Sequence, residues 1–244
     1  MTTTLAVSGK GGSGKTTLAA LLVRELVALK AGPVLAVDAD PNACLGLTLG
    51  VEVVGNIADL RERARHQQPS NTGMDRLSTF EYGLNGIITE AQGFDLVTMG
   101  RPEGPDCYCA ANNLLRKFLD KLSSQYAFVV LDNEAGMEHL SRRTTNHVDL
   151  LLAVAQPSPI GRLTVQRIFE LTASLPIEIK QAGIVWNQTH EPQTLDSIET
   201  LGCIPHDPDV LEACMQGKTI FDLADDNPAL AVVRSLLQER LCSV

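Results

Sequence analysis

The sequence predicts an α/β fold, a single domain over residues 1–244 in which a mainly parallel β-sheet is flanked by helices on both faces. Short runs that are apolar throughout alternate along the chain with stretches of helical spacing. No linker rich in Pro, Gly or Ser divides them. Strands that are apolar on both sides are typical of parallel sheets covered by helices, which bind ligands at the carboxyl ends of their strands.

Each expected strand is a short apolar run bounded by polar or turn residues. In order, these strands are Leu5–Ser8, Val34–Val37, Phe94–Met99, Ala127–Leu131, Leu150–Val154 and Gly183–Trp186. Apolar residues three and four positions apart predict helices over Thr16–Lys30, Ala110–Leu122, Glu138–Asn146, Gly161–Ser174, Leu195–Leu201 and Ala229–Leu241. The stretch His66–Asn85 is polar and receives no assignment beyond an insertion or connection.

Composition excludes several classes of protein. The formal net charge of -9 argues against nucleic acid or anionic lipid as partners. The first residues lack the positive region of a signal peptide, and no apolar run is long enough to span a bilayer. We therefore expect a cytoplasmic protein whose six cysteines are reduced thiols.

A phosphate-binding motif lies between the first strand and the first helix. Gly9–Thr16 fits G-x-x-x-x-G-K-[ST] in the strand–loop–helix context that the motif needs, which argues against a glycine-rich turn without a ligand. We expect Lys15 to reach the β- and γ-phosphates, Thr16 to bind Mg²⁺ and Thr17 to assist at the α-phosphate. Backbone N–H groups of the loop complete the site, from Gly11, Gly12, Ser13 and Gly14.

Lys10 occupies a position that the general motif leaves free, and alone it could simply point into water. The loop Lys10–Thr17 as a whole resembles the deviant Walker A loop of the MinD, ParA and nitrogenase iron protein superfamily. The resemblance implies a P-loop NTPase fold, ATP hydrolysis to ADP and an ATP-dependent homodimer. Lys10 would then act on the nucleotide of the other subunit, as an arginine finger does.

Two acidic segments follow expected strands. Asp38-Ala39-Asp40-Pro41 suits magnesium chemistry, and Asp40 is our candidate for orienting the hydrolytic water. Its alternative interpretation is a solvated acidic loop. The segment resembles switch I of the superfamily, which implies that Asp38 contacts the Mg²⁺ shell.

The second acidic segment, Asp132–Gly136, has the form D-x-x-A-G and resembles switch II. The resemblance implies that Asp132 organises Mg²⁺ through water and that Gly136 offers an N–H to the γ-phosphate. The chain departs from the pattern at Asn133 and Glu134. Because a carboxylate beside the γ-phosphate is unfavourable, we expect Glu134 to face Mg²⁺ or a partner.

Cys107 and Cys109 form a C-x-C that provides two metal ligands. A two-fold dimer would bring four sulfurs together, enough for tetrahedral Zn²⁺ or square-planar Ni²⁺. Two ordinary thiols are the alternative.

Three segments together are similar to the CooC-type ATPases that insert nickel during carbon monoxide dehydrogenase maturation: Asp38–Gly46, Cys107–Cys109 and Asp132–Leu140. This resemblance implies a metal site at the dimer interface, nickel as the metal and carbon monoxide dehydrogenase as the client. A positioning or partition ATPase and an iron–sulfur reductase component are the alternatives.

Two later positions complete the expected nucleotide site. Asn187 ends a strand and resembles the superfamily's adenine-reading asparagine, with Gln188 in place of the lysine that often follows. Pro205 resembles a residue of its adenine-flanking loop. Either could instead belong to a plain turn at a strand end.

Overall fold

The computed structural model describes residues 2–66, 83–101, 115–116, 119, 122–134, 147–195 and 198–241. Its strands form one sheet of eight, in the order β3-β4-β2-β5-β1-β6-β7-β8. They are β1 (Thr3–Gly9), β2 (Val34–Asp38), β3 (Thr89–Glu90), β4 (Phe94–Thr98), β5 (Phe128–Asp132), β6 (His147–Ala155), β7 (Glu178–Asn187) and β8 (Thr200–Ile204). All neighbours pair in parallel except the short edge strand β3, which runs antiparallel to β4. The predicted α/β fold with a mainly parallel sheet is confirmed.

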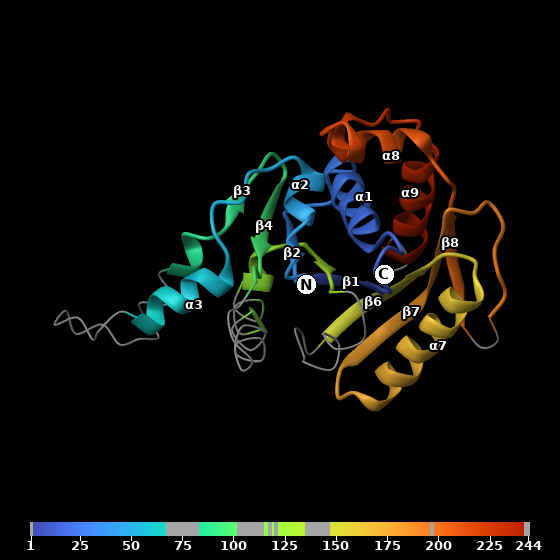
Figure 1. Ribbon diagram of the computed structural model, residues 1–244, viewed down its shortest axis with the longest axis horizontal. Coiled ribbons are helices and arrows are strands. Elements are labelled where there is room, and N and C mark those ends of the chain that lie inside the picture. Colours follow the sequence, from blue (N-terminus) through green and yellow to red (C-terminus); the bar gives the residue numbers. More distant parts are fainter. Residues whose placement is uncertain are drawn as a thin grey trace.

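Helices cover both faces of this sheet (Figure 1). They are α1 (Lys15–Ala28), α2 (Leu45–Leu49), α3 (Ile57–His66), α7 (Pro159–Ser174), α8 (Pro208–Met215) and α9 (Pro228–Leu241), with the 3₁₀ turns η1 (Ser123–Gln125) and η2 (Ile220–Asp222). Figure 1 shows α1, α8 and α9 on one side of the sheet and α7 on the other. No described helix is long and apolar enough to cross a membrane.

Alternation along the strands divides the core into two clusters, one for each face. In β1, Leu5 and Val7 pack toward α1 and α9, whereas Ala6 joins the opposite cluster with Trp186 and Val165 of α7. Each of these side chains is at most 1% exposed. Both faces of the sheet are therefore shielded from solvent, as the continuous apolar strands predict.

The expected helix over Leu195–Leu201 is wrong. Ile184 donates its N–H to the Glu199 carbonyl at 2.8 Å, and Thr200 begins β8 beside β7. Gly183 allows this approach, since a Cβ there would lie 2.8 Å from the Glu199 oxygen. Pairing with a strand distant in sequence thus outweighs local helical spacing.

Other expectations fall partly outside the described residues. Of the helix expected over Ala110–Leu122, the described positions include the buried Leu115, Leu119 and Leu122, spaced as one helical face. The helix expected over Glu138–Asn146 lies outside the described residues. In the unassigned stretch His66–Asn85, the structure describes only the end of α3 at His66 and residues 83–85.

Charged pairs fasten α1, the helix that follows the phosphate loop, to the C-terminal segment. Arg234 of α9 holds Glu25 through Nε at 2.7 Å and Nη2 at 3.3 Å, and Glu25 is only 1% exposed. One residue earlier, Arg24 donates to the Leu223 carbonyl at 2.6 Å and to Asp225 at 3.1 Å. These contacts fix the far side of α1.

The Glu25–Arg234 pair should be asymmetric in its effect on stability. In Arg234→Met the buried carboxylate has lost its partner, which we expect to cost about 3 kcal/mol and to lower Tm by roughly 6 to 10 °C. In Glu25→Gln the Arg234 side chain, 35% exposed, can turn to water, so the loss should be about 1 kcal/mol. Thermal denaturation of both variants measures the difference, and equal losses would contradict this account.

Candidate nucleotide-binding site

The phosphate loop connects β1 to α1 in a tight turn. Ser13 donates its N–H to the Lys10 carbonyl at 3.1 Å. Gly12 and Gly14 adopt φ of 77° and 98°, and Gly14 is the N-cap of α1. Because such angles favour glycine, the motif's glycines are needed for this path. The α1 N-terminus at Lys15 therefore opens onto the loop, where an anion is favoured.

A cavity of about 360 Å³ extends from this turn toward the ends of β7 and β8. It is lined by Gly12, Gly14, Lys15, Thr16, Thr17, Leu18, Leu21, Asn187, Gln188, Ile204, Pro205, His206, Asp207, Val210 and Leu211. The expected base residues Asn187 and Pro205 thus share one cavity with Lys15, Thr16 and Thr17. Polar groups lie at its loop end and apolar side chains at its α8 end, as suits phosphates and a base.

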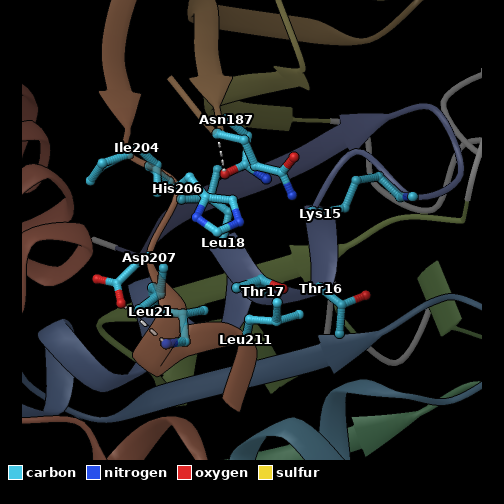
Figure 2. Close-up of a pocket in the computed structure, with 15 residues that line it drawn as sticks. Lys15, Thr16, Thr17, Leu18, Leu21, Asn187, Ile204, His206, Asp207 and Leu211 are labelled. Atoms are coloured by element: carbon cyan, nitrogen blue, oxygen red, sulfur yellow. Dashed lines mark hydrogen bonds between the residues drawn. The ribbon is translucent and has the colours of Figure 1, made fainter. Parts of the chain in front are cut away.

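Eight of these lining residues were not among the expected site residues: Leu18, Leu21, Gln188, Ile204, His206, Asp207, Val210 and Leu211. In the view of Figure 2 the His206 ring lies between Asn187 and Thr17. Val210 and Leu211 come from α8, whose N-cap Asp207 accepts N–H bonds from Asp209 at 2.9 Å and Val210 at 3.3 Å. The motif Asp207-Pro208, a capping residue followed by proline, was the available signal for this helix.

The two lysines of the loop differ in environment. Lys15 is 6% exposed, and its Nζ lies 3.4 Å from the Lys10 carbonyl oxygen. Lys10 is exposed and lines a second cavity of about 200 Å³ with Gly11, Ser13 and residues of the β6–α7 connection. Lys15 therefore belongs to the larger cavity, whereas Lys10 is exposed to solvent at the second one.

Buried polar atoms without partners gather at the carboxyl edge of the sheet. Among the described residues, those lacking a hydrogen bond are Ser8 Oγ, Ser13 Oγ, Thr98 Oγ1, Asn133 Oδ1 and both carboxylate oxygens of Asp132, together with the distant Arg24 Nη1. Buried polar atoms are normally satisfied, so such a cluster indicates a site for a polar ligand or ion.

Asp38 and Asp132 are opposite each other at the ends of β2 and β5. Burial raises the pKa of Asp38 to about 7, and the nearby Asp132 adds to the rise. The N–H bond that Asp38 accepts from Leu45 lowers this pKa but does not cancel the effect of burial. Burial likewise raises the pKa of Asp132 to about 6, although the Thr16 hydroxyl and the Lys15 ammonium lower it. A divalent cation beside Thr16 and Asp132 would relieve this unfavourable charge, so these groups fit Mg²⁺.

Asp38, the last residue of β2, and Asp40 anchor the segment that follows the strand. Asp38 accepts N–H bonds from Asp40 at 3.2 Å and Leu45 at 2.8 Å, so both of its oxygens are engaged. Asp40 Oδ1 accepts from the backbone and side chain of Asn42, at 2.8 and 2.9 Å. Asp40 also contributes to the raised pKa of Asp132, so the two carboxylates lie near each other.

The segment after β5 is tied to its neighbours. Asn133, 1% exposed, donates from Nδ2 to the Val7 carbonyl at 3.0 Å, and Ala39 donates its N–H to the Asp132 carbonyl at 3.0 Å. Asn133 thus supports β1 from behind the phosphate loop. Gly136, the expected γ-phosphate contact, lies outside the described residues.

The metal-binding expectation also falls outside them, since Cys107 and Cys109 are not described. Within the described part of the chain, no group of three or more His, Cys, Asp and Glu side chains could hold a metal ion. Cys44 is exposed and Cys203 half-buried, both as free thiols.

The family model for the CobQ/CobB/MinD/ParA nucleotide binding domain matches residues 4–220. The chain belongs to this family. It is 36% identical over 247 residues to an uncharacterised ATP-binding protein of Methanocaldococcus jannaschii, covering 96% of this chain and 97% of that one. Members and structural neighbours of the CobQ/CobB/MinD/ParA family are nucleotide-binding ATPases, and this chain is an ATPase of the same type.

Two further proteins are similar over nearly the whole chain. The carbon monoxide dehydrogenase accessory protein CooC of Rhodospirillum rubrum is 30% identical over 259 residues, covering 96% of each chain. The septum site-determining protein MinD of Pyrococcus horikoshii, solved in complex with Mg-ADP, superposes with a TM-score of 0.72 at 21% identity, covering 98% of this chain and 96% of that one. The structural similarity to MinD supports the P-loop fold of this chain.

Proposed function

We propose that this ATPase is a nucleotide-switched homodimer that carries a metal ion at Cys107 and Cys109 and assists nickel insertion into carbon monoxide dehydrogenase. The nucleotide part is supported by one observation above all. The phosphate loop and the apolar side chains of α8 line one cavity, and the buried Asp132 carboxylate interacts with Thr16 and Lys15 of that loop. The metal part is supported by the similarity to CooC and by the C-x-C.

In this proposal, ATP lies with its phosphates against Gly11–Thr17 and its base near Asn187 and Pro205. Thr16 and Asp132, with Asp38 beside Asp132, would hold Mg²⁺, which would supply charge neutralisation at the phosphates. Lys15 binds the terminal phosphate oxygens, and Asp40 orients the water that attacks in line. Lys10, which is exposed, reaches the nucleotide of a second copy.

The same geometry offers a way to report the γ-phosphate. The backbone bond between Ala39 and Asp132 joins the starts of the two switch segments, so a shift of one is passed to the other. Both segments begin at the carboxyl edge of the sheet, where the loop that carries the exposed Lys10 also begins. Dimer contacts would then depend on which nucleotide is bound.

The metal site is tested by metal analysis of the native protein and of Cys107→Ser/Cys109→Ser after loading with Ni²⁺ or Zn²⁺. We expect about one ion per two native chains and almost none in the variant, with ATP hydrolysis retained. Cys44→Ser/Cys203→Ser, which replaces two free thiols elsewhere, is the matched control and should bind metal normally. Full metal binding by Cys107→Ser/Cys109→Ser would contradict the metallochaperone function, and a brown protein with broad visible absorption would favour an iron–sulfur cluster.

A MinD- or ParA-like positioning role is the second candidate, favoured by the structural likeness to the septum site-determining protein. In that role the cysteines are incidental and the dimer binds DNA or a membrane. The net charge of -9 disfavours it.

A further inference from the structure

Asn187 is held at the end of β7 by its neighbours on both sides. Its strand pairs Trp186 with Ala155 of β6 and Asn187 with Ile204 of β8. Trp186 is fully buried, and its Nε1 donates to the Gln193 carbonyl at 3.0 Å. The Asn187 backbone is therefore rigidly placed beside the phosphate loop.

The side-chain amide of Asn187 has a defined orientation. Its Nδ2 donates to the Ser13 carbonyl at 2.8 Å, and its Oδ1 accepts the Gln188 N–H at 3.0 Å. Gln188 presents this N–H from a left-handed backbone with φ of 60°. A flipped amide would set NH₂ against N–H and oxygen against oxygen, so only one orientation satisfies both contacts.

The amide also occupies the space that a side chain on Gly14 would need. A Cβ on Gly14 would lie 2.1 Å from Asn187 Nδ2, far inside contact distance. Gly14, with φ of 98°, is the residue at which the loop becomes α1. Asn187 is thus packed against the point where the loop must keep its shape.

We infer that Asn187 is a positioning residue that holds the phosphate loop in its anion-binding shape, in addition to any contact with the base. This inference rests on the proposed nucleotide site. In a planar trans peptide the C=O and N–H point in opposite directions. Fixing the Ser13 carbonyl on Asn187 therefore turns the Gly14 N–H away from Asn187, where phosphate oxygens can accept it, and a freed glycine peptide could rotate.

This role and a purely base-reading role differ in their effect on a ligand that has no base. An asparagine amide has two donors and two acceptor sites, so one donor and one acceptor remain for adenine. If Asn187 contacts only the base, removal of its side chain should leave the affinity for inorganic tripolyphosphate unchanged. A residue that holds the loop affects tripolyphosphate and ATP alike.

Calorimetric titration with Mg²⁺-tripolyphosphate and with Mg²⁺-ATP distinguishes the loop-positioning role of Asn187 from a base-reading role. We expect Asn187→Ala to bind both about tenfold more weakly and Asn187→Asp, which cannot donate to the Ser13 carbonyl, to lose at least as much. In hydrolysis, kcat should fall as well as KM rise, because the phosphates are misplaced. Gln181→Ala, an exposed amide on the same strand, is the control and should match the native protein.

Native tripolyphosphate affinity and native kcat in Asn187→Ala, with only the KM for ATP raised, would overturn the positioning role and leave the nucleotide site standing. If the native protein bound neither ligand, the nucleotide site itself would be wrong. Thermal denaturation of each variant shows whether it is folded. Should Asn187→Ala unfold, Asn187→Asp, which retains the bond from Gln188, decides through the same two affinities.

Discussion

Replacement of Lys15 by methionine should lower ATP hydrolysis at least a hundredfold and remove measurable ATP binding. The Lys15 residue is 6% exposed at the N-terminus of α1 and lines the same cavity as Thr16. A buried cation beside developing phosphate charge contributes strongly to catalysis because little water screens it. Phosphate release and calorimetry measure the two effects.

Two further lysine variants sharpen this test. Lys30→Met changes an exposed lysine just after the other end of α1 and should hydrolyse ATP at the native rate. Lys10→Met should bind ATP normally, since Lys10 does not line the larger cavity, yet lose hydrolysis. If Lys10 acts across a dimer, the native rate per chain should also rise with protein concentration, and a constant rate would argue against the dimer.

Replacement of Asp132 by asparagine should stabilise the ligand-free protein at pH 8 while abolishing Mg²⁺-dependent hydrolysis. The pKa of Asp132 is raised to about 6 by burial, which the Thr16 hydroxyl and the Lys15 ammonium offset only in part. The ionised carboxylate is therefore unfavourable in the folded state. Its removal should contribute about 2 kcal/mol, or roughly 5 °C in Tm.

The stability of the ligand-free protein should increase as the pH falls. Because the folded pKa values of Asp132 and Asp38 lie above the ordinary value of 3.8, the folded protein takes up protons as the pH falls through about 7 and 6. The ligand-free native protein should thus gain stability between pH 8 and about pH 5, and Asp132→Asn should gain less.

With saturating Mg²⁺-ATP at pH 8, the native protein should become more stable than Asp132→Asn. Only the native carboxylate can bind the Mg²⁺ cation. Asp226→Asn, which removes an exposed carboxylate between η2 and α9, is the control for net charge. A Tm for Asp132→Asn below the native value at pH 8 without ligand would contradict the claim that the ionised Asp132 carboxylate destabilises the ligand-free protein.

Local sequence predicted the parts of the site that are continuous in the chain. β1, the phosphate loop and α1 follow from one motif, and the carboxylates at the ends of β2 and β5 follow from apolar runs that end in aspartate. The parallel register then brings Asp38 and Asp132 together, as expected for carboxyl ends of adjacent strands.

Features that depend on distant pairing were missed. The helix expected over Leu195–Leu201 was wrong and overlapped the first two residues of β8, a strand whose place is set by pairing with β7 rather than by its own residues. The wall of His206, Val210 and Leu211 needs α8 to pack near α1. The bond from Asn187 to Ser13 joins residues 174 apart, which no local pattern indicates.

A crystal structure with Mg²⁺ and the non-hydrolysable ATP analogue adenylyl imidodiphosphate tests the nucleotide site most directly. The analogue's phosphates should lie against Gly11–Thr17 with Lys15 at the terminal group, Mg²⁺ should lie beside Thr16 and Asp132, and the base should lie between Asn187 and Pro205. A structure with the analogue bound elsewhere and the phosphate loop empty would contradict the account.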